Sequence, residues 1–249
     1  MYRVLAVLLF PFLLASWGDY TLSPQEYFGE SYHEAVSFLR SQTDDFNNLT
    51  QRYDVDKRMA MAIIFPELIR YNRFRDFAET TVLELTYVDD GPLAADFSIG
   101  RFQMKPSFVE QLETIVMENE ALSNFSHIAQ YSTPDNVKSV RTERLKRLKQ
   151  HQWQMEYLAC FMTIGQNRFS AIIDSNPHEE LLILSSLYNL SLNATYQQLQ
   201  QTAQSNLSLW AAEYGQLFIL RCGQLFLHTP CNKPDVVLKL AGISKTNRG

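Results

Sequence analysis

Apolar residues at helical spacing dominate this chain. Beyond the first two dozen positions they recur every three to four residues in segment after segment, which is the pattern of helices that bury one face. No internal repeat, low-complexity tract or linker rich in glycine and serine divides these segments. The 249 residues, of which 46% are hydrophobic, are enough to bury a sizeable core. The sequence therefore predicts a mainly α protein with a single helical domain.

The N-terminus has the pattern of a secretory signal. Residues 4–17 are almost wholly apolar, they follow the positive charge of Arg3, and small residues lie three and one position before Asp19. The apolar run is shorter than the ~20 residues of a membrane-spanning helix. We expect residues 1–18 to be a signal peptide and residues 19–249 to be a mature domain that is periplasmic or secreted in a bacterial cell envelope. Membrane contact is expected only during export, and a buried N-terminal helix is the alternative.

Charge and histidine spacing argue against several classes of ligand. The formal net charge of -5 is mild, whereas nucleic-acid binders usually carry a strongly basic surface. The five histidines are scattered, and none is paired at the spacing of metal ligands. We therefore expect no nucleic-acid partner, no metal and no cofactor.

The three cysteines are expected to differ in role. Cys222 and Cys231 flank a short loop, which a disulfide could close in an extracytoplasmic compartment. Cys160 lies in an apolar helical stretch, where a cysteine behaves as a small core residue.

Helix ends are indicated by polar and proline residues. Ser-Pro-Gln-Glu at 23–26 is a capping-box pattern with proline in the first turn, and it opens a helix that extends through Leu39. Asp54 or Asp56 can cap a second helix, which Pro66 kinks or ends. The predicted helices cover residues 24–39, 57–70, 107–119, 140–164, 178–190 and about 195–226.

Residues 73–88 are ambiguous. Phe74, Phe77 and Leu85 are spaced for a helix, whereas residues 80–88 contain enough β-branched side chains for a short hairpin. Asp-Asp-Gly-Pro at 89–92 then predicts a turn. The segment is expected to add a helix, a short β-hairpin or a loop insertion.

Three short motifs occur in a fixed order. The apolar run at 59–66 ends in Glu67, Gly-Arg-Phe-Gln-Met-Lys-Pro covers 100–106, and Tyr188-Asn189 lies in a later apolar helix. In this order they resemble the motifs of the lytic transglycosylases, which belong to the lysozyme-like superfamily. The resemblance covers roughly residues 53–190 and leaves a C-terminal helical extension over 195–249. Within it, residues 153–158 resemble the helix that packs behind the groove in that family. The resemblance implies a lysozyme-like helical domain with a substrate groove.

The resemblance implies that Glu67 is the catalytic residue. In that family one glutamic acid protonates the bridging oxygen between N-acetylmuramic acid and N-acetylglucosamine. It then takes a proton from the 6-hydroxyl of the sugar, so that no second carboxylate is obligatory. Glu67 lies among Phe65, Pro66 and Leu68, and an apolar setting keeps a carboxyl group protonated. The implied partner is the glycan strand of peptidoglycan, and protein partners are left open.

Further residues are implied to bind the substrate. Gln103 offers amide groups that can hold a sugar, or else brace its own loop. Tyr188 could donate its hydroxyl toward Glu67 or the substrate, with core packing as the alternative. Asp96, together with Asp89 and Asp90, could hold a water as in goose-type lysozymes, although such a string is usually a turn. The implied substrate-binding set is Gln103, Met104, Phe102, Tyr188, Asn189 and Asp96.

The chain also departs from the family pattern. Leu68 replaces the usual serine after the catalytic residue, the segment between Glu67 and Gly100 is longer, and Arg101 and Phe102 replace smaller side chains. An inactive peptidoglycan-binding module that keeps the groove is therefore the alternative function, beside a hydrolase. A basic run is expected to be a solvated helix face, and secondarily a surface for acidic wall polymers; it comprises Arg141, Arg144, Lys146, Arg147 and Lys149.

Overall fold

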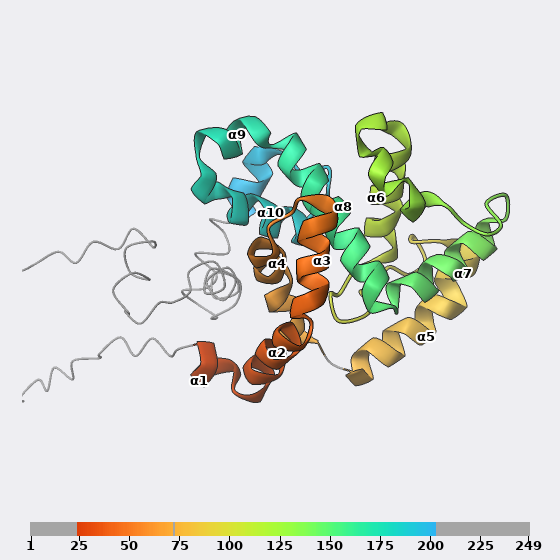
Figure 1. Ribbon diagram of the computed structural model, residues 1–249. Coiled ribbons are helices and arrows are strands. Elements are labelled where there is room, and N and C mark those ends of the chain that lie inside the picture. The colour runs from red at the N-terminus through yellow and green to blue at the C-terminus, as the bar shows by residue number, and fades with distance from the viewer. Residues whose placement is uncertain (1–23, 72, 203–249) are drawn as a thin grey trace, which may run out of the picture.

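The computed structural model describes residues 24–71 and 73–202, and helices make up most of this part (Figure 1). The mainly α class is confirmed. Within these residues the β structure amounts to one isolated bridge between Ile99 and Met104. No helix in the described ranges has the length and apolarity needed to cross a bilayer. The predicted signal peptide, Cys222, Cys231 and most of the C-terminal extension lie outside the described residues.

The first helices differ from the prediction in two places. The helix expected from Pro24 through Leu39 is two helices, because Gly29 adopts a φ of 51° and interrupts it. A helix that the sequence did not predict follows at once, and its polar sequence buries Phe46 and Leu49. These helices are α1 (Pro24–Phe28), α2 (Glu30–Ser41) and α3 (Thr43–Tyr53).

Helix α4 (Lys57–Arg70) begins at the predicted cap. Asp56 accepts a hydrogen bond from the backbone N–H of Arg58 at 2.8 Å, while Asp54 ends α3 in the left-handed conformation. Pro66 does not end the helix, which continues to Arg70. Helices α2, α3, α8 and α10 all pack against α4. This packing compensates for the backbone hydrogen bond that Pro66 cannot donate, so the helix continues past it.

Residues 73–90 form one helix, α5 (Arg73–Asp90), so the hairpin alternative is wrong. The periodicity also did not show which face of this helix is buried. Leu83 and Tyr87 are buried, whereas the predicted apolar face of Phe74, Phe77 and Leu85 points to solvent. The helix lies beside α7 at the edge of the molecule, so only a narrow stripe of it reaches the core (Figure 1).

The second half of the fold is arranged around a central helix. The helix predicted at 140–164 is two, because Lys149 and Gln150 separate α7 from α8. Helix α8 runs through the middle of the molecule and buries Cys160, as predicted (Figure 1). The elements are α6 (Pro106–Glu118), η1 (Glu120–Ala129), α7 (Val137–Leu148), α8 (His151–Arg168), α9 (Ser170–Ser175), η2 (Pro177–Glu179) and α10 (Glu180–Asn189). Residues 196–202 are again helical.

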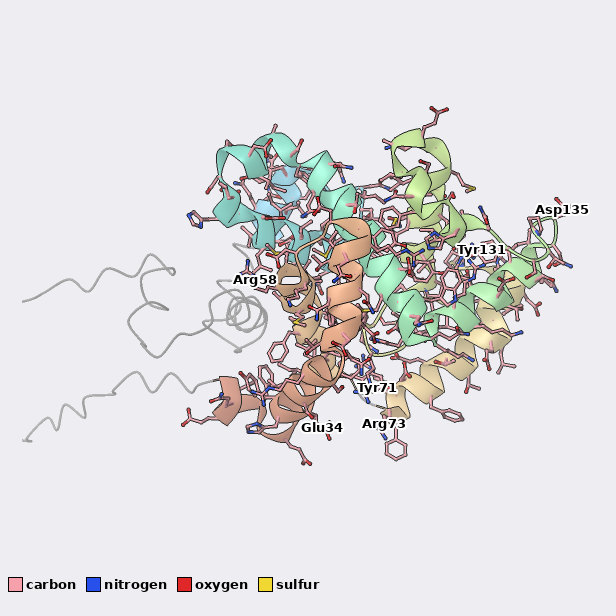
Figure 2. The ribbon with its side chains drawn as sticks, viewed as in Figure 1. Glu34, Arg58, Tyr71, Arg73, Tyr131 and Asp135 are labelled. Carbon is pink, nitrogen blue, oxygen red and sulfur yellow. The ribbon has the colours of Figure 1, made fainter. Side chains whose placement is uncertain are left out.

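The basic run of α7 is not a solvated face throughout. Arg144 is 6% exposed, and its guanidinium pairs with Glu113 at 2.6 Å and with Glu110 at 2.9 Å. Arg147 is equally buried and lies 4.3 Å from the ring centroid of Tyr131, which Figure 2 labels beside α7. The expectation of a solvated face is wrong for these two residues, because carboxylates and a ring on neighbouring segments take the place of water.

Candidate active site

A pocket of about 350 Å³ opens where four parts of the chain meet. The end of α4, the start of α5, the segment at 96–107 with the first turns of α6, and the end of α10 all contribute to its wall. Among its lining residues are Glu67, Asp96, Gln103, Met104, Tyr188 and Asn189. Six of the seven residues singled out in the sequence therefore lie around one cavity, although they are up to about 120 positions apart in the chain.

Glu67 lies in the last turn of α4 and is 7% exposed. Burial raises the pKa of its carboxyl group, because an ionised carboxylate loses its hydration there. The guanidinium of Arg70, one turn further along, pairs with the carboxylate and opposes this rise, and Arg75 opposes it from α5. The carboxyl group is thus largely shielded from water, but the pocket wall around it is mostly polar, and it includes a cation that the sequence did not predict.

The segment that carries the second motif is fixed from behind by Gln154 of α8. The side-chain amide of Gln154 donates to the carbonyl oxygens of Leu148 at 2.6 Å and Ile99 at 3.3 Å, and its oxygen accepts from the N–H of Phe102 at 3.3 Å. Gly100 has a φ of 71°, and an added Cβ would lie 1.7 Å from this amide nitrogen. The glycine is therefore required by both its backbone angle and the close approach of Gln154.

Gln103 projects into the pocket from a strained backbone. Its φ of 51° is rare for a residue with a side chain, and such angles persist where the surroundings enforce them. The side-chain amide donates to the carbonyl of Gly100 at 2.8 Å, and its oxygen accepts from Arg75 at 3.3 Å. Gln103 thus braces its own loop and also presents an amide to the cavity.

Phe102 and Arg101 do not line the pocket. The ring of Phe102 is fully buried in the core, so its prediction as a substrate-binding side chain is corrected. The guanidinium of Arg101 lies over the rings of Phe38 and Tyr71, at 4.7 and 5.1 Å from their centroids. What Phe102 supplies to the site is its backbone carbonyl, which accepts from the hydroxyl of Tyr188 at 2.6 Å.

The Tyr-Asn pair closes the pocket from α10. Because the Tyr188 hydroxyl donates to the loop carbonyl, it does not donate to Glu67 as the sequence had suggested. Burial and the nearby charge of Glu67 raise the pKa of this phenol, which keeps it a donor. The side-chain nitrogen of Asn189 donates to the carbonyl of Ser185 at 2.9 Å, and its oxygen lies 3.5 Å from Arg70. Met104 is buried and adds an apolar part of the wall.

The three aspartates do not come together. Asp96 lines the pocket, but its carboxylate accepts hydrogen bonds from the N–H and the hydroxyl of Ser107, at 3.0 and 2.6 Å. This arrangement fixes the start of α6. Asp89 pairs with Lys138 at 2.7 Å, and neither Asp89 nor Asp90 is among the residues that line the pocket.

A second cavity, of about 420 Å³, lies between α3, η1 and α8. Its only glutamate, Glu156, accepts hydrogen bonds from Arg52 and Tyr53 and lies 3.1 Å from His127. These three partners engage the carboxylate in the contact between α3, η1 and α8. The larger cavity is thus a less suitable place for acid catalysis than the pocket around Glu67.

Sequence reasoning missed Arg70 and Arg75. The spacing of Glu67 and Arg70, three residues apart on one helix, was a usable signal for the first of them. Gln154 was expected only as part of a helix behind the groove, because its hydrogen bonds depend on contacts across the fold. Among the described residues there is no group of three or more His, Cys, Asp or Glu side chains that could hold a metal ion.

No family model, curated protein or solved structure matches this chain. A function for the chain therefore has to be argued from the geometry of the pocket and the order of its motifs.

Proposed function

We propose that this protein is a lytic transglycosylase that cleaves the bond between N-acetylmuramic acid and N-acetylglucosamine in peptidoglycan, in a lysozyme-like groove. The observation that carries the proposal is a nearly buried carboxyl group, Glu67, at the wall of a pocket whose other polar groups come from distant segments. Buried carboxyl groups with raised pKa values are the usual proton donors of glycosidases. The order of the three motifs along the chain, which resembles that of the lytic transglycosylases, supports the same function.

The reaction needs one residue that first gives and then takes a proton. Glu67 donates its proton to the bridging oxygen while the bond from that oxygen to the anomeric carbon breaks and an oxocarbenium-like centre forms. The carboxylate then accepts the proton of the 6-hydroxyl, whose oxygen bonds to the anomeric carbon. The product is a 1,6-anhydro sugar, no water is consumed, and Glu67 is protonated again. The amide of Gln103 is suited to hold an N-acetyl or hydroxyl group of the sugar.

A hydrolase is the weaker enzymatic alternative. Hydrolysis with inversion needs a second carboxylate that accepts a proton from water. Asp96 is the other carboxylate of the pocket wall among the described residues, and two hydrogen bonds from Ser107 already occupy it. Transfer to the 6-hydroxyl of the sugar avoids this requirement.

An inactive binding module remains the second candidate, and the ion pair between Glu67 and Arg70 is the observation that favours it. A cation beside the carboxylate stabilises the ionised form, which cannot donate a proton. Such a protein would bind glycan strands in the groove without turnover.

Digestion of purified sacculi, followed by mass analysis of the released fragments, distinguishes these functions. We expect anhydro ends from the wild type and a roughly 10²–10⁴-fold loss of release in Glu67→Gln, which keeps shape but removes the proton. Glu118→Gln, at an exposed position of α6, is the matched control and should release as much as the wild type. Gln103→Ala and Tyr188→Phe should lose less, because the proton donor remains.

Each of the other outcomes has a definite meaning. Reducing ends would identify a hydrolase, and retained pull-down of sacculi without release would identify a binding module. Undiminished release by Glu67→Gln would show that another residue is the acid.

A further inference from the structure

Two arginines occupy the groups that a substrate would contact. Nitrogen Nη2 of Arg70 pairs with the Glu67 carboxylate, and the same atom lies 3.5 Å from the side-chain oxygen of Asn189. Arg75 donates to the side-chain oxygen of Gln103 at 3.3 Å. Both arginines lie within a few residues of the junction between α4 and α5, where Figure 2 labels Tyr71 and Arg73.

The pair between Arg70 and Glu67 is unequal in exposure. The side chain of Glu67 is 9% exposed, whereas that of Arg70 is 42% exposed. The arginine can therefore turn into solvent and be hydrated there, whereas the carboxyl group stays buried. If Arg70 leaves, Glu67 remains buried without its nearest counter-ion, and burial favours the protonated form.

Other charged and titratable groups also lie near Glu67. Arg75 acts on it from α5, and Tyr188 faces it from α10 as a neutral phenol. Asp96 and Lys105 line the same pocket from the segment before α6 and lie within 4.0 Å of each other. Arg70 pairs directly with the Glu67 carboxylate and also reaches solvent.

We propose that Arg70 is a positioning residue that holds Glu67 in an ion pair in which Glu67 does not donate a proton. A carboxylate on the glycan binds Arg70 in place of Glu67, and Glu67 is then able to act as the acid. The inference rests on the proposed function and narrows its substrate to an acidic glycan. Arginine suits this exchange, because its planar fork binds carboxylates with two hydrogen bonds. A neutral polymer of N-acetylglucosamine offers no such partner, so it leaves the pair intact.

The first test needs no substrate. The pKa of Glu67 is measured from the carboxyl ¹³C signal in protein labelled at glutamate, with Glu67→Gln used to assign the resonance. Arg70→Gln should raise this pKa above that of the wild type, and Arg70→Lys should restore it toward the wild-type value. Arg58→Gln is the control, since Arg58 pairs with Asp56 at the exposed start of the same helix.

The titration decides the first half of the inference. An unchanged pKa in Arg70→Gln would overturn it, as would an equal rise in Arg58→Gln. A purely structural role of Arg70 would instead lower the melting temperature in Arg70→Gln and leave the pKa of Glu67 where it is in the wild type.

The second test compares muramyl oligosaccharides that carry free carboxylates with the same oligosaccharides after amidation of those carboxylates. We expect wild-type kcat/KM to be about tenfold higher for the acidic form, the size of one charge-assisted hydrogen bond. Arg70→Gln should lose this preference. Equal cleavage of both forms by the wild type, or a preference that persists in Arg70→Gln, would overturn the exchange. If the wild type cleaves neither form, the proposed function fails, while the titration still decides the role of Arg70.

Discussion

Glu67 combines two properties that are unfavourable for folding. It is an ionisable group with little contact to water, and it sits in a helix whose neighbouring side chains are apolar. Burying an ionised carboxylate costs free energy unless a partner compensates, and the side chain of Arg70 is itself 42% exposed. In the function proposed above, such a site gives up stability for a carboxyl group that can donate a proton.

The cost depends on pH in a definite direction. Because burial raises the pKa of Glu67 in the folded protein, the folded state keeps its proton at pH values where the unfolded state has lost it. The contribution of the protonated Glu67 side chain to folding stability is fully present below the pKa of an unfolded glutamate, about 4.3. It is lost as the pH rises through the higher pKa of Glu67 in the folded protein.

We therefore expect Glu67→Gln to be more stable than the wild type at pH 7 and about equally stable at pH 4. Glutamine is neutral at both pH values, so the variant avoids the free-energy cost of a buried charge at pH 7. Thermal unfolding of both proteins at the two pH values measures the difference, with Glu118→Gln as the exposed control. A variant that is less stable than the wild type at pH 7 would show that the ion pair with Arg70 outweighs burial.

At the scale of elements, local signals predicted some helices well and others poorly. Helix α4 begins after Asp56, one of the two predicted caps, and α6 begins at Pro106, one residue before its predicted start, because caps and prolines act on the residues next to them. The break at Gly29 and the whole of α3 were missed. Gly29 breaks the helix through its backbone angle, and α3 buries only two apolar side chains of its own.

The site shows the same division. The order of the motifs was enough to predict that Glu67, Gln103 and Tyr188 would line one pocket. It did not predict the partner of the Tyr188 hydroxyl or the left-handed backbone of Gln103, because both depend on how the loop at 96–106 packs against α8. Periodicity likewise left the segment of α5 open between a helix and a hairpin, and it did not show which face of the helix is buried.

Helix α5 offers a direct test of that orientation. Leu83 is fully buried and Leu85 is 71% exposed, although the two residues are chemically identical and share one helix. Leu83→Ala should lower the free energy of unfolding by about 2–5 kcal/mol, whereas Leu85→Ala should stay within about 0.5 kcal/mol of the wild type. Urea unfolding curves of the two variants give both values. Equal losses would mean that the outward face of α5 is covered by another part of the protein.

On the scale of the whole molecule, the pocket depends on contacts that lie outside it. Asp96 and Ser107 fix the start of α6, and α6 is in turn tied to α5 and α7 by a buried polar cluster. In this cluster Arg144 of α7 bonds to Glu113 and Glu110 of α6 and, at 2.6 Å, to the hydroxyl of Tyr87 of α5. The cluster is polar, so its geometry specifies how the three helices meet.

Removing one member of this cluster should therefore be far more harmful than removing an exposed ion pair. Arg144→Ala leaves two carboxylates without their cation, and Glu113 is itself only 4% exposed, so we expect a loss of about 3–5 kcal/mol. Lys138→Ala, which breaks the exposed pair with Asp89 on the same two helices α5 and α7, should leave the urea midpoint unchanged. The double variant Arg144→Ala, Glu113→Ala should lose less than the sum of its two single variants, because neither charge is then left buried alone. Additive losses of stability, or an Arg144→Ala variant as stable as the wild type, would show that apolar contacts alone hold α6 and α7 together. The buried arginine would then contribute nothing to the framework of the pocket.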